Sequence, residues 1–237
     1  MIVNISYQTL VQPPPFAFAY TLELNFEASQ VKIKYDLEFL NRDEISPEEI
    51  EEEGFSENDD FSWEGSLGKE WVDDLMNDLA DVDLEEEEGD DYNIYLHMEI
   101  KYDDGHVESG TVVLADDWDY RLQEVIQAIY EKAGIEDKLK MTCLDINDGK
   151  QDKYILTGSF EHRSAAINDK PIAWDKLHEI IADIYTIEFD QEPVQTPKEE
   201  GLWIDPDGMS GFQCFDEQAR PKGNQIKERI LKELTQA

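Results

Sequence analysis

The residues best able to recognise a partner lie in one strongly acidic stretch of the chain. Between residues 43 and 91 the sequence has 23 acidic residues and one basic residue, Lys69, with large aromatic side chains interleaved. Carboxylates bind Lys and Arg, and aromatic rings stack on guanidinium groups or fill pockets. The pattern therefore predicts a surface for a positively charged partner. The predicted partner-binding residues are Glu51, Glu52, Glu53, Asp59, Asp60, Phe61, Trp63, Glu85, Glu86, Glu87 and Glu88.

A solvated insertion is the alternative interpretation of this stretch. Runs of like charge are most often exposed to solvent, and aromatic residues such as Phe55 and Trp71 would then attach the insertion to the protein body. Repulsion among so many carboxylates destabilises a compact state. The charge is therefore tied to solubility or to a partner, and not to folding.

Catalysis is not predicted for this chain. It requires acid, base or nucleophilic groups that converge, and the histidines and cysteines show no spacing that suggests this. Each histidine is expected to be an exposed surface residue: His97, His106, His162 and His178. Cys143 and Cys214 lie in apolar strand patterns, where burial raises the pKa of a thiol. No catalytic residue and no cofactor is assigned, and a carboxylate-based hydrolase is the weakest alternative.

Two short acidic segments, residues 145–149 and 205–208, resemble fragments of calcium-binding loops. Neither follows the twelve-residue pattern with its closing Glu. Asp, Asn and Gly are also the residues that tight turns require. The sequence therefore predicts turns at both places, with weak, unspecific cation binding and no dedicated metal site.

Composition restricts the partners and the compartment. The 237-residue chain carries a formal net charge of −37, yet 40% of its residues are apolar, enough for a folded core. Such a charge repels nucleic acid and anionic lipid, so neither direct nucleic-acid binding nor a membrane partner is expected. It has two lone cysteines, an N-terminal segment unlike a signal peptide, and no apolar run near the roughly 20 residues of a membrane-spanning helix. These features predict a cytoplasmic protein.

Alternation of apolar and polar residues predicts antiparallel strands with one buried and one exposed face. Asp104-Gly105 and Asp148-Gly149 are turn signals between paired strands. Three prolines, residues 13–15, end the N-terminal strand because proline does not fit within a central strand. The predicted strands cover residues 3–11, 16–26, 31–39, 92–102, 107–114, 139–146 and 154–160.

Helical periodicity follows several of these strands. Ser46, Pro47 and Glu49 form an N-terminal capping signal for a short helix. The apolar spacing of residues 122–130 recurs in residues 177–185, either by repetition or because amphipathic helices resemble one another. The longer predicted helices cover residues 67–82, 117–133, 171–185 and 226–234.

These elements predict an α+β fold. The expected antiparallel sheet is built from successive β-hairpins, each followed by an amphipathic helix packed on one face, with ββα units as candidate repeats and an acidic insertion. Either one compact body or two small packed domains fits this length. The predicted segments are an N-terminal strand and hairpin (1–42), an acidic, partly helical and partly disordered segment (43–91), two hairpin–helix units (92–190), and a C-terminal hairpin with a basic helix (191–237).

The expected function is a non-catalytic acidic binding protein that neutralises or masks a basic partner, as an immunity-type inhibitor or a nucleic-acid mimic does. A nuclease or another nucleic-acid-binding protein is the candidate partner, since spaced carboxylates can take the place of phosphates. The alternative is an adaptor or chaperone-like module whose acidic–aromatic segment is a flexible docking peptide that orders only on binding.

Overall fold

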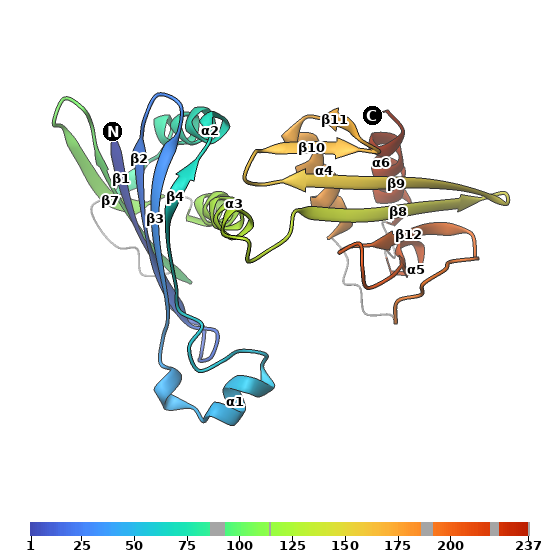
Figure 1. Ribbon diagram of the computed structural model, residues 1–237, viewed down its shortest axis with the longest axis horizontal. Coiled ribbons are helices and arrows are strands. Elements are labelled where there is room, and N and C mark those ends of the chain that lie inside the picture. Colours follow the sequence, from blue (N-terminus) through green and yellow to red (C-terminus); the bar gives the residue numbers. More distant parts are fainter. Residues whose placement is uncertain (86–92, 114, 186–191, 219–222, 237) are drawn as a thin grey trace. The chain divides into compact units, whose positions relative to one another are not determined.

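The computed structural model describes the chain except for residues 86–92, 114, 186–191, 219–222 and 237. Its contacts divide the chain into two compact units, Met1–Ile129 and Tyr130–Ala237. Each unit has its own antiparallel sheet (Figure 1). The four-segment division made along the sequence stays a prediction.

The first unit is built on a seven-stranded antiparallel sheet. The order across the sheet is β4-β3-β2-β1-β6-β7-β5, which places β1 between the hairpins β2–β3 and β6–β7. The strands are β1 (Ile2–Thr9), β2 (Phe18–Phe26), β3 (Val31–Phe39), β4 (Phe61–Leu67), β5 (Leu84–Glu85), β6 (Ile94–Lys101) and β7 (Val107–Val112).

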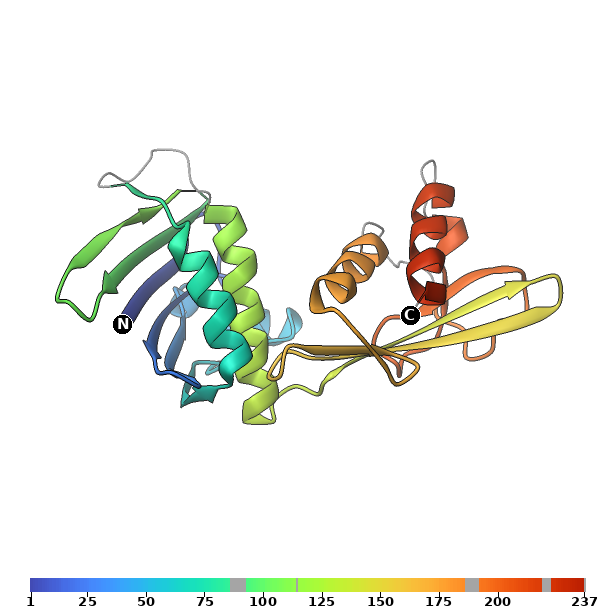
Figure 2. The same ribbon diagram turned by 90° about the horizontal axis from the view of Figure 1, so that it is seen from above.

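One face of this sheet is apolar because alternate residues of neighbouring strands are in register. Val3 of β1 lies opposite Leu24 of β2 and Ile100 of β6, and all three side chains are buried. The helices α2 (Lys69–Ala80) and α3 (Ala115–Ala133) cover this face (Figure 2). Trp71 of α2 and Leu122 of α3 are fully buried.

The opposite face of the sheet is polar. One cross-strand row there runs through six strands and consists of Thr111, His97, Ser6, Thr21, Asp36 and Ser62. Short hydroxyl, imidazole and carboxylate side chains suit a face in contact with water. The first unit is therefore a two-layer structure, with helices on one side of its sheet.

The second unit has a six-stranded antiparallel sheet in the order β11-β10-β9-β8-β12-β13. Its core joins Met141, Cys143 and Leu156 of the sheet to Leu177 and Ile230 of the helices, which lie on one side of the sheet (Figure 2). The elements are β8 (Leu139–Asn147), β9 (Lys150–Ser159), β10 (Ser164–Ile167), β11 (Lys170–Ile172), α4 (Trp174–Ile184), β12 (Gly201–Asp205), β13 (Gln213–Cys214), α5 (Phe215–Gln218) and α6 (Gly223–Gln236).

Local sequence signals are confirmed. The hairpins β2–β3, β6–β7 and β8–β9 form as predicted, and Asp148 and Gly149 have positive φ angles of 49° and 73° in the last of these turns. The amphipathic helices α2, α3, α4 and α6 are also present.

The predicted sheet built from ββα repeats is wrong. There are two separate sheets, and the first has β1 at its centre instead of a series of hairpins. In the second, the hairpin β10–β11 comes between β8–β9 and α4, so Pro171, expected to begin a helix, lies in a strand. Strand neighbours are chosen by contacts between distant residues, which an alternating pattern does not specify.

The predicted acidic insertion is also wrong. Residues 61–67 form β4, which pairs along its length with β3, and residues 69–80 form α2, whose Trp71 and Leu75 are fully buried. The acidic stretch thus supplies an edge strand and a core helix to the first unit. None of the helices in the described part of the chain has the length and apolar character to cross a membrane.

Gly65 allows the Trp63 ring to lie along β4. A Cβ atom at Gly65 would stand 2.3 Å from Cζ2 of Trp63. We expect Gly65→Ala to displace the ring and to lower the free energy of unfolding by about 1–3 kcal/mol, as overpacking does. Urea denaturation measures this, with Ser66→Ala on the polar face as the matched control. Equal stability of the two variants would contradict the expectation.

Candidate functional site: an acidic tip on the first sheet

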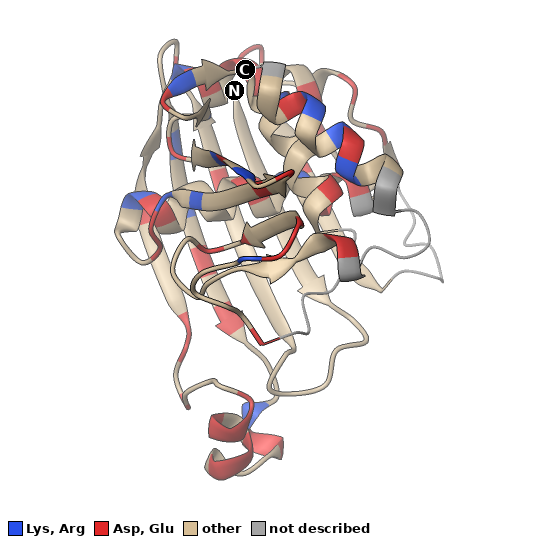
Figure 3. Ribbon diagram, turned by 90° about the vertical axis from the view of Figure 1, so that its right-hand side faces the viewer, with Lys and Arg blue, Asp and Glu red and all other residues tan. Residues whose placement is uncertain are grey.

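The connection from β3 to β4, residues 40–60, forms an acidic tip at one end of the first sheet (Figure 1). It contains a short 3-10 helix, η1 (Arg42–Glu44), and the helix α1 (Pro47–Glu52). Ten carboxylates fall between residues 43 and 60, with no basic residue among them. Figure 3 shows the predominance of acidic positions along α1, at the bottom of that view.

The helix α1 begins with the capping box expected from the sequence. The Glu49 amide donates to Oγ of Ser46 at 3.3 Å, and the Ser46 amide donates to the Glu49 carboxylate at 2.9 Å. Hydrogen bonding of the Glu49 carboxylate, first to the Ser46 backbone amide and then to the Ser46 side chain, lowers the pKa of Glu49. Ile50 is the buried residue of this helix. The helix is thus held in a defined orientation by its cap and by one apolar side chain.

Arg42 fixes the tip to the sheet. Its side chain is only 9% exposed, and its Nη1 lies 2.7 Å from the Asp59 carboxylate and also donates to the Ser56 carbonyl. The guanidinium lies 4.1 Å from the ring centroid of Phe39 and 5.1 Å from that of Phe55. Its Nε and Nη2 atoms have no hydrogen-bond partner among the described residues. Stacking on two rings and one ion pair therefore hold this buried cation.

Three of the ten carboxylates have structural roles. Asp59 pairs with Arg42 and accepts hydrogen bonds from the amide and hydroxyl of Ser56. Asp60 accepts a 2.8 Å hydrogen bond from the Phe39 amide, and Glu49 completes the helix cap. No hydrogen bond or ion pair within the described part of the chain engages the other seven, which are exposed: Asp43, Glu44, Glu48, Glu51, Glu52, Glu53 and Glu57.

The structure separates the predicted residues into different environments. Glu51, Glu52 and Glu53 are exposed on the tip. Phe61 and Trp63 are half-buried and lie opposite Leu37 and Tyr35 on the helix-covered face of the sheet. A role for these two aromatic residues as partner anchors stays a prediction.

The second part of the predicted surface lies beyond α2. Glu85 is exposed in β5, where it pairs with Thr111 of β7. Glu86, Glu87 and Glu88 lie outside the described residues. Their proposed contribution of charge therefore stays a prediction.

Exposed apolar side chains adjoin the tip, and sequence reasoning missed them. Leu10, Val11 and Phe16 of the β1–β2 loop are 52%, 63% and 42% exposed. The Phe16 ring makes an edge-to-face contact with Phe55 of the tip, 5.5 Å between centroids. Apolar residues beside free carboxylates match the pattern of interfaces, in which charge surrounds a hydrophobic anchor. The sequence pattern places Leu10 and Val11 at the end of the first predicted strand and Phe16 at the start of the second, and it does not indicate that they are exposed together.

Arg42 was also missed, although one signal could have found it. It is the base that directly precedes the acidic run, and Phe39 and Phe55 flank it on either side in the sequence. A single Arg between aromatic residues and many carboxylates favours a buried, stacked guanidinium. Which carboxylate it meets depends on the folded loop, and the sequence leaves that open.

Among the groups tested for catalysis, one thiol is buried and two imidazole rings have structural contacts. Cys143 is fully buried, which raises the pKa of its thiol to about 12 and removes it as a nucleophile at neutral pH. His97 Nε2 contacts the Ser109 hydroxyl at 3.0 Å on the polar sheet face, and His106 pairs with Glu108. Within the described residues, no group of three or more potential metal-ligating side chains converges.

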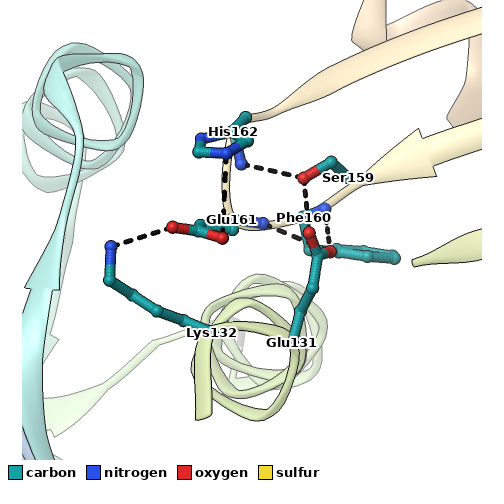
Figure 4. Close-up of polar contacts among 6 residues, drawn as sticks. All are labelled: Glu131, Lys132, Ser159, Phe160, Glu161 and His162. Carbon is teal, nitrogen blue, oxygen red and sulfur yellow. Dashed lines mark hydrogen bonds and ion pairs between the residues drawn. The ribbon is translucent and has the colours of Figure 1, made fainter. Parts of the chain in front are cut away.

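A buried carboxylate in the second unit has the partners of a structural residue. Glu131 accepts hydrogen bonds from Oγ of Ser159 at 2.5 Å and from the Phe160 amide at 2.7 Å (Figure 4). The His162 amide, and not its ring, donates to Ser159. Ser159 is therefore the donor to Glu131, and no imidazole ring in the described part of the chain forms a hydrogen bond with it, so this cluster fixes the turn after β9.

Comparison of the chain with protein-family models, with curated proteins and with solved structures finds no match.

Arg42→Lys is expected to loosen the tip while keeping its charge, because an ammonium group does not stack between Phe39 and Phe55. We expect the free energy of local opening of the tip to fall by about 1–2 kcal/mol, which corresponds to roughly 5–30-fold faster hydrogen exchange of the tip amides. Exchange at Gly54 and Phe55 measures this directly. Lys69→Gln, which removes an exposed cation at the opposite end of β4 from the tip, should leave these rates unchanged. Equal acceleration in both variants would argue against a role of the Arg42 guanidinium in holding the tip.

The tip is expected to open in acid. Burial raises the pKa of Asp59, but hydrogen bonds from Ser56 and Arg42 outweigh this and lower it overall. A lowered folded-state pKa contributes stability that is present above the unfolded value of about 3.9 and is lost as pH falls through the folded value. The Ser56 amide resonance should therefore change only below about pH 4. A midpoint above that value, or an unaltered transition in Asp59→Asn, would contradict this.

Proposed function

We propose that this protein is a non-catalytic acidic binding protein that masks a basic partner, as an immunity-type inhibitor or a nucleic-acid mimic does. The observation that carries the proposal is the set of seven exposed carboxylates on a tip that is held in place by Arg42 and Asp59. Carboxylates without cations on the same chain are available to Lys and Arg side chains of another protein.

A preformed surface is favoured over a flexible docking segment. The capping box, the Arg42 clamp and the pairing of β4 with β3 give residues 43–67 defined positions without a partner. Little conformational entropy of this segment is then lost on binding, which favours tight association. The adaptor alternative requires a segment that orders only when it binds.

The free carboxylates and the apolar loop have different roles in the proposed interface. The carboxylates steer a basic partner and raise its association rate, by roughly 10- to 1,000-fold at low salt. Phe16, in the same loop as the exposed Val11, is the proposed anchor that slows dissociation. Basic nucleases and other nucleic-acid-binding proteins have the matching charge. We place the interaction in the cytoplasm, because Cys143 and Cys214 are free thiols.

Neutralising the tip tests the proposal. In Glu51→Gln/Glu52→Gln/Glu53→Gln, affinity for the partner at low salt should fall by about tenfold, since each exposed ion pair contributes a few tenths to about 1 kcal/mol. The matched control is Glu192→Gln/Glu199→Gln/Glu200→Gln, which makes the same change in net charge at exposed sites of the second unit.

The readout is capture of basic proteins from nuclease-treated host lysate, followed by a titration of the captured protein against each variant. One basic protein should be retained by the wild type and by the control variant of the second unit, and it should be lost from the variant of the tip. Equal retention by the two variants would show that the attraction depends only on net charge, which would contradict the proposal. Phe16→Ala should then raise the dissociation rate with little change in salt dependence.

A further inference from the structure

The strand β4 is one edge of the first sheet (Figure 1), and it pairs with β3 along its whole length, from Phe61 to Leu67. Among the described strands it has no neighbour on its other side. Every second residue of an antiparallel edge strand directs its backbone N–H and C=O groups away from the sheet. The edge therefore offers a row of backbone donors and acceptors to a further strand.

Two carboxylates without partners lie near this edge on the polar face of the sheet. Glu23 of β2 and Glu64 of β4 are aligned on either side of Lys34 of β3. Both are exposed, and neither has a hydrogen-bond or ion-pair partner in the described part of the chain. Lys34 pairs instead with Asp36, at 3.3 Å. The two carboxylates are therefore available to cations of another molecule.

A hollow of about 660 Å³ opens on the same face and reaches the edge. Glu23, Glu64 and Ser66 help to line it. Lys32 also lines the hollow, but its ammonium group pairs with Glu27. A long basic side chain on an added strand could therefore enter the hollow and meet both free carboxylates.

The opposite face of β4 is apolar. Trp63 is half-buried there, and its ring lies over Gly65, which has no side chain to displace it. The ring thus extends along the strand and presents apolar surface to side chains on a neighbouring strand, the contact that stabilises cross-strand pairs.

We propose that β4 binds an extended basic segment of the partner protein by strand addition. Backbone hydrogen bonds would supply affinity, and the alternation of side chains would supply specificity. Lys or Arg at every second position of the segment reaches Glu23 and Glu64, and apolar residues between them contact Trp63. Charge selects this occupant, because residues 61–67 contain no Lys or Arg and follow directly after the acidic tip. The inference rests on the proposed function, since it specifies which part of a basic partner is recognised.

The test is a titration of the full chain with an acetylated, amidated seven-residue peptide of alternating lysine and valine, which matches the length of β4. Amide hydrogen exchange and NMR are the readouts. Alternate amides of β4, those not bonded to β3, should become protected from exchange, and the Trp63 indole resonance should shift. The same peptide with N-methylated backbone amides keeps its charge but cannot pair as a strand, so it should produce neither effect.

Two variants test the contribution of charge at the edge. Glu64→Gln should weaken binding of the peptide by roughly two- to fivefold, the effect of losing one exposed ion pair. Glu38→Gln is the matched control, because Glu38 is exposed on β3 beyond the end of its pairing with β4. At constant ionic strength it should change the affinity far less.

Equal effects of the two peptides would overturn strand addition, because the attraction would then depend on charge alone. Resonance shifts confined to residues 43–57 of the tip would also overturn it. Protection of β4 that rises with protein concentration in the absence of peptide would do the same, since a second copy would then occupy the edge.

Failure of this inference can be distinguished from failure of the proposed function. A basic protein that is captured through the tip but leaves the β4 amides unprotected would overturn strand addition alone. Capture of no basic protein would overturn the proposed function.

Discussion

The distribution of cations among an excess of carboxylates governs this structure. The chain has 57 acidic and 20 basic residues, so most carboxylates must be held by N–H and O–H donors or remain in water. Four of the basic side chains join separate elements: Arg42 holds the tip, Arg121 lies between Asp78 of α2 and Glu124 of α3, and Lys176 and Arg229 connect α4 and α6. Elsewhere, backbone amides take the role of the missing cations, as at Asp60 and Asp207.

This division gives the acidic residues two separate uses. A carboxylate with a cation or an amide donor is part of the framework, and a carboxylate without one is surface charge. Asp59 and Glu53 are close in sequence and equal in formal charge, yet the first fixes the tip and the second faces solvent. The amino-acid sequence does not distinguish these two kinds of carboxylate. The ion pairs and hydrogen bonds in the structure show which carboxylates remain available to a partner.

The parts of the fold that depend on neighbouring residues could be predicted. The Ser46 capping box, the turn at Asp148 and Gly149, and the alternation through β2 and β3 are set by short-range chemistry. The central position of β1 could not be predicted, because Val3 pairs with both Leu24 and Ile100, and these residues are far apart in the chain. The same holds at the candidate site, where the exposed carboxylates were identified but Arg42 and the loop at Phe16 were missed. Their roles depend on contacts across the end of the sheet.

The edge of the first sheet shows a further effect of the surface charge. β4 is an outermost strand, and the backbone groups along such an edge can pair with a strand of a second copy. Many natural edge strands avoid this with a lysine, a proline or a bulge, and β4 has neither lysine nor proline. It has the exposed Glu64 within it, the acidic tip before it and Glu70 just after it. Two copies that approached edge to edge would bring these carboxylates together, so the same charge that attracts a basic protein keeps like molecules apart.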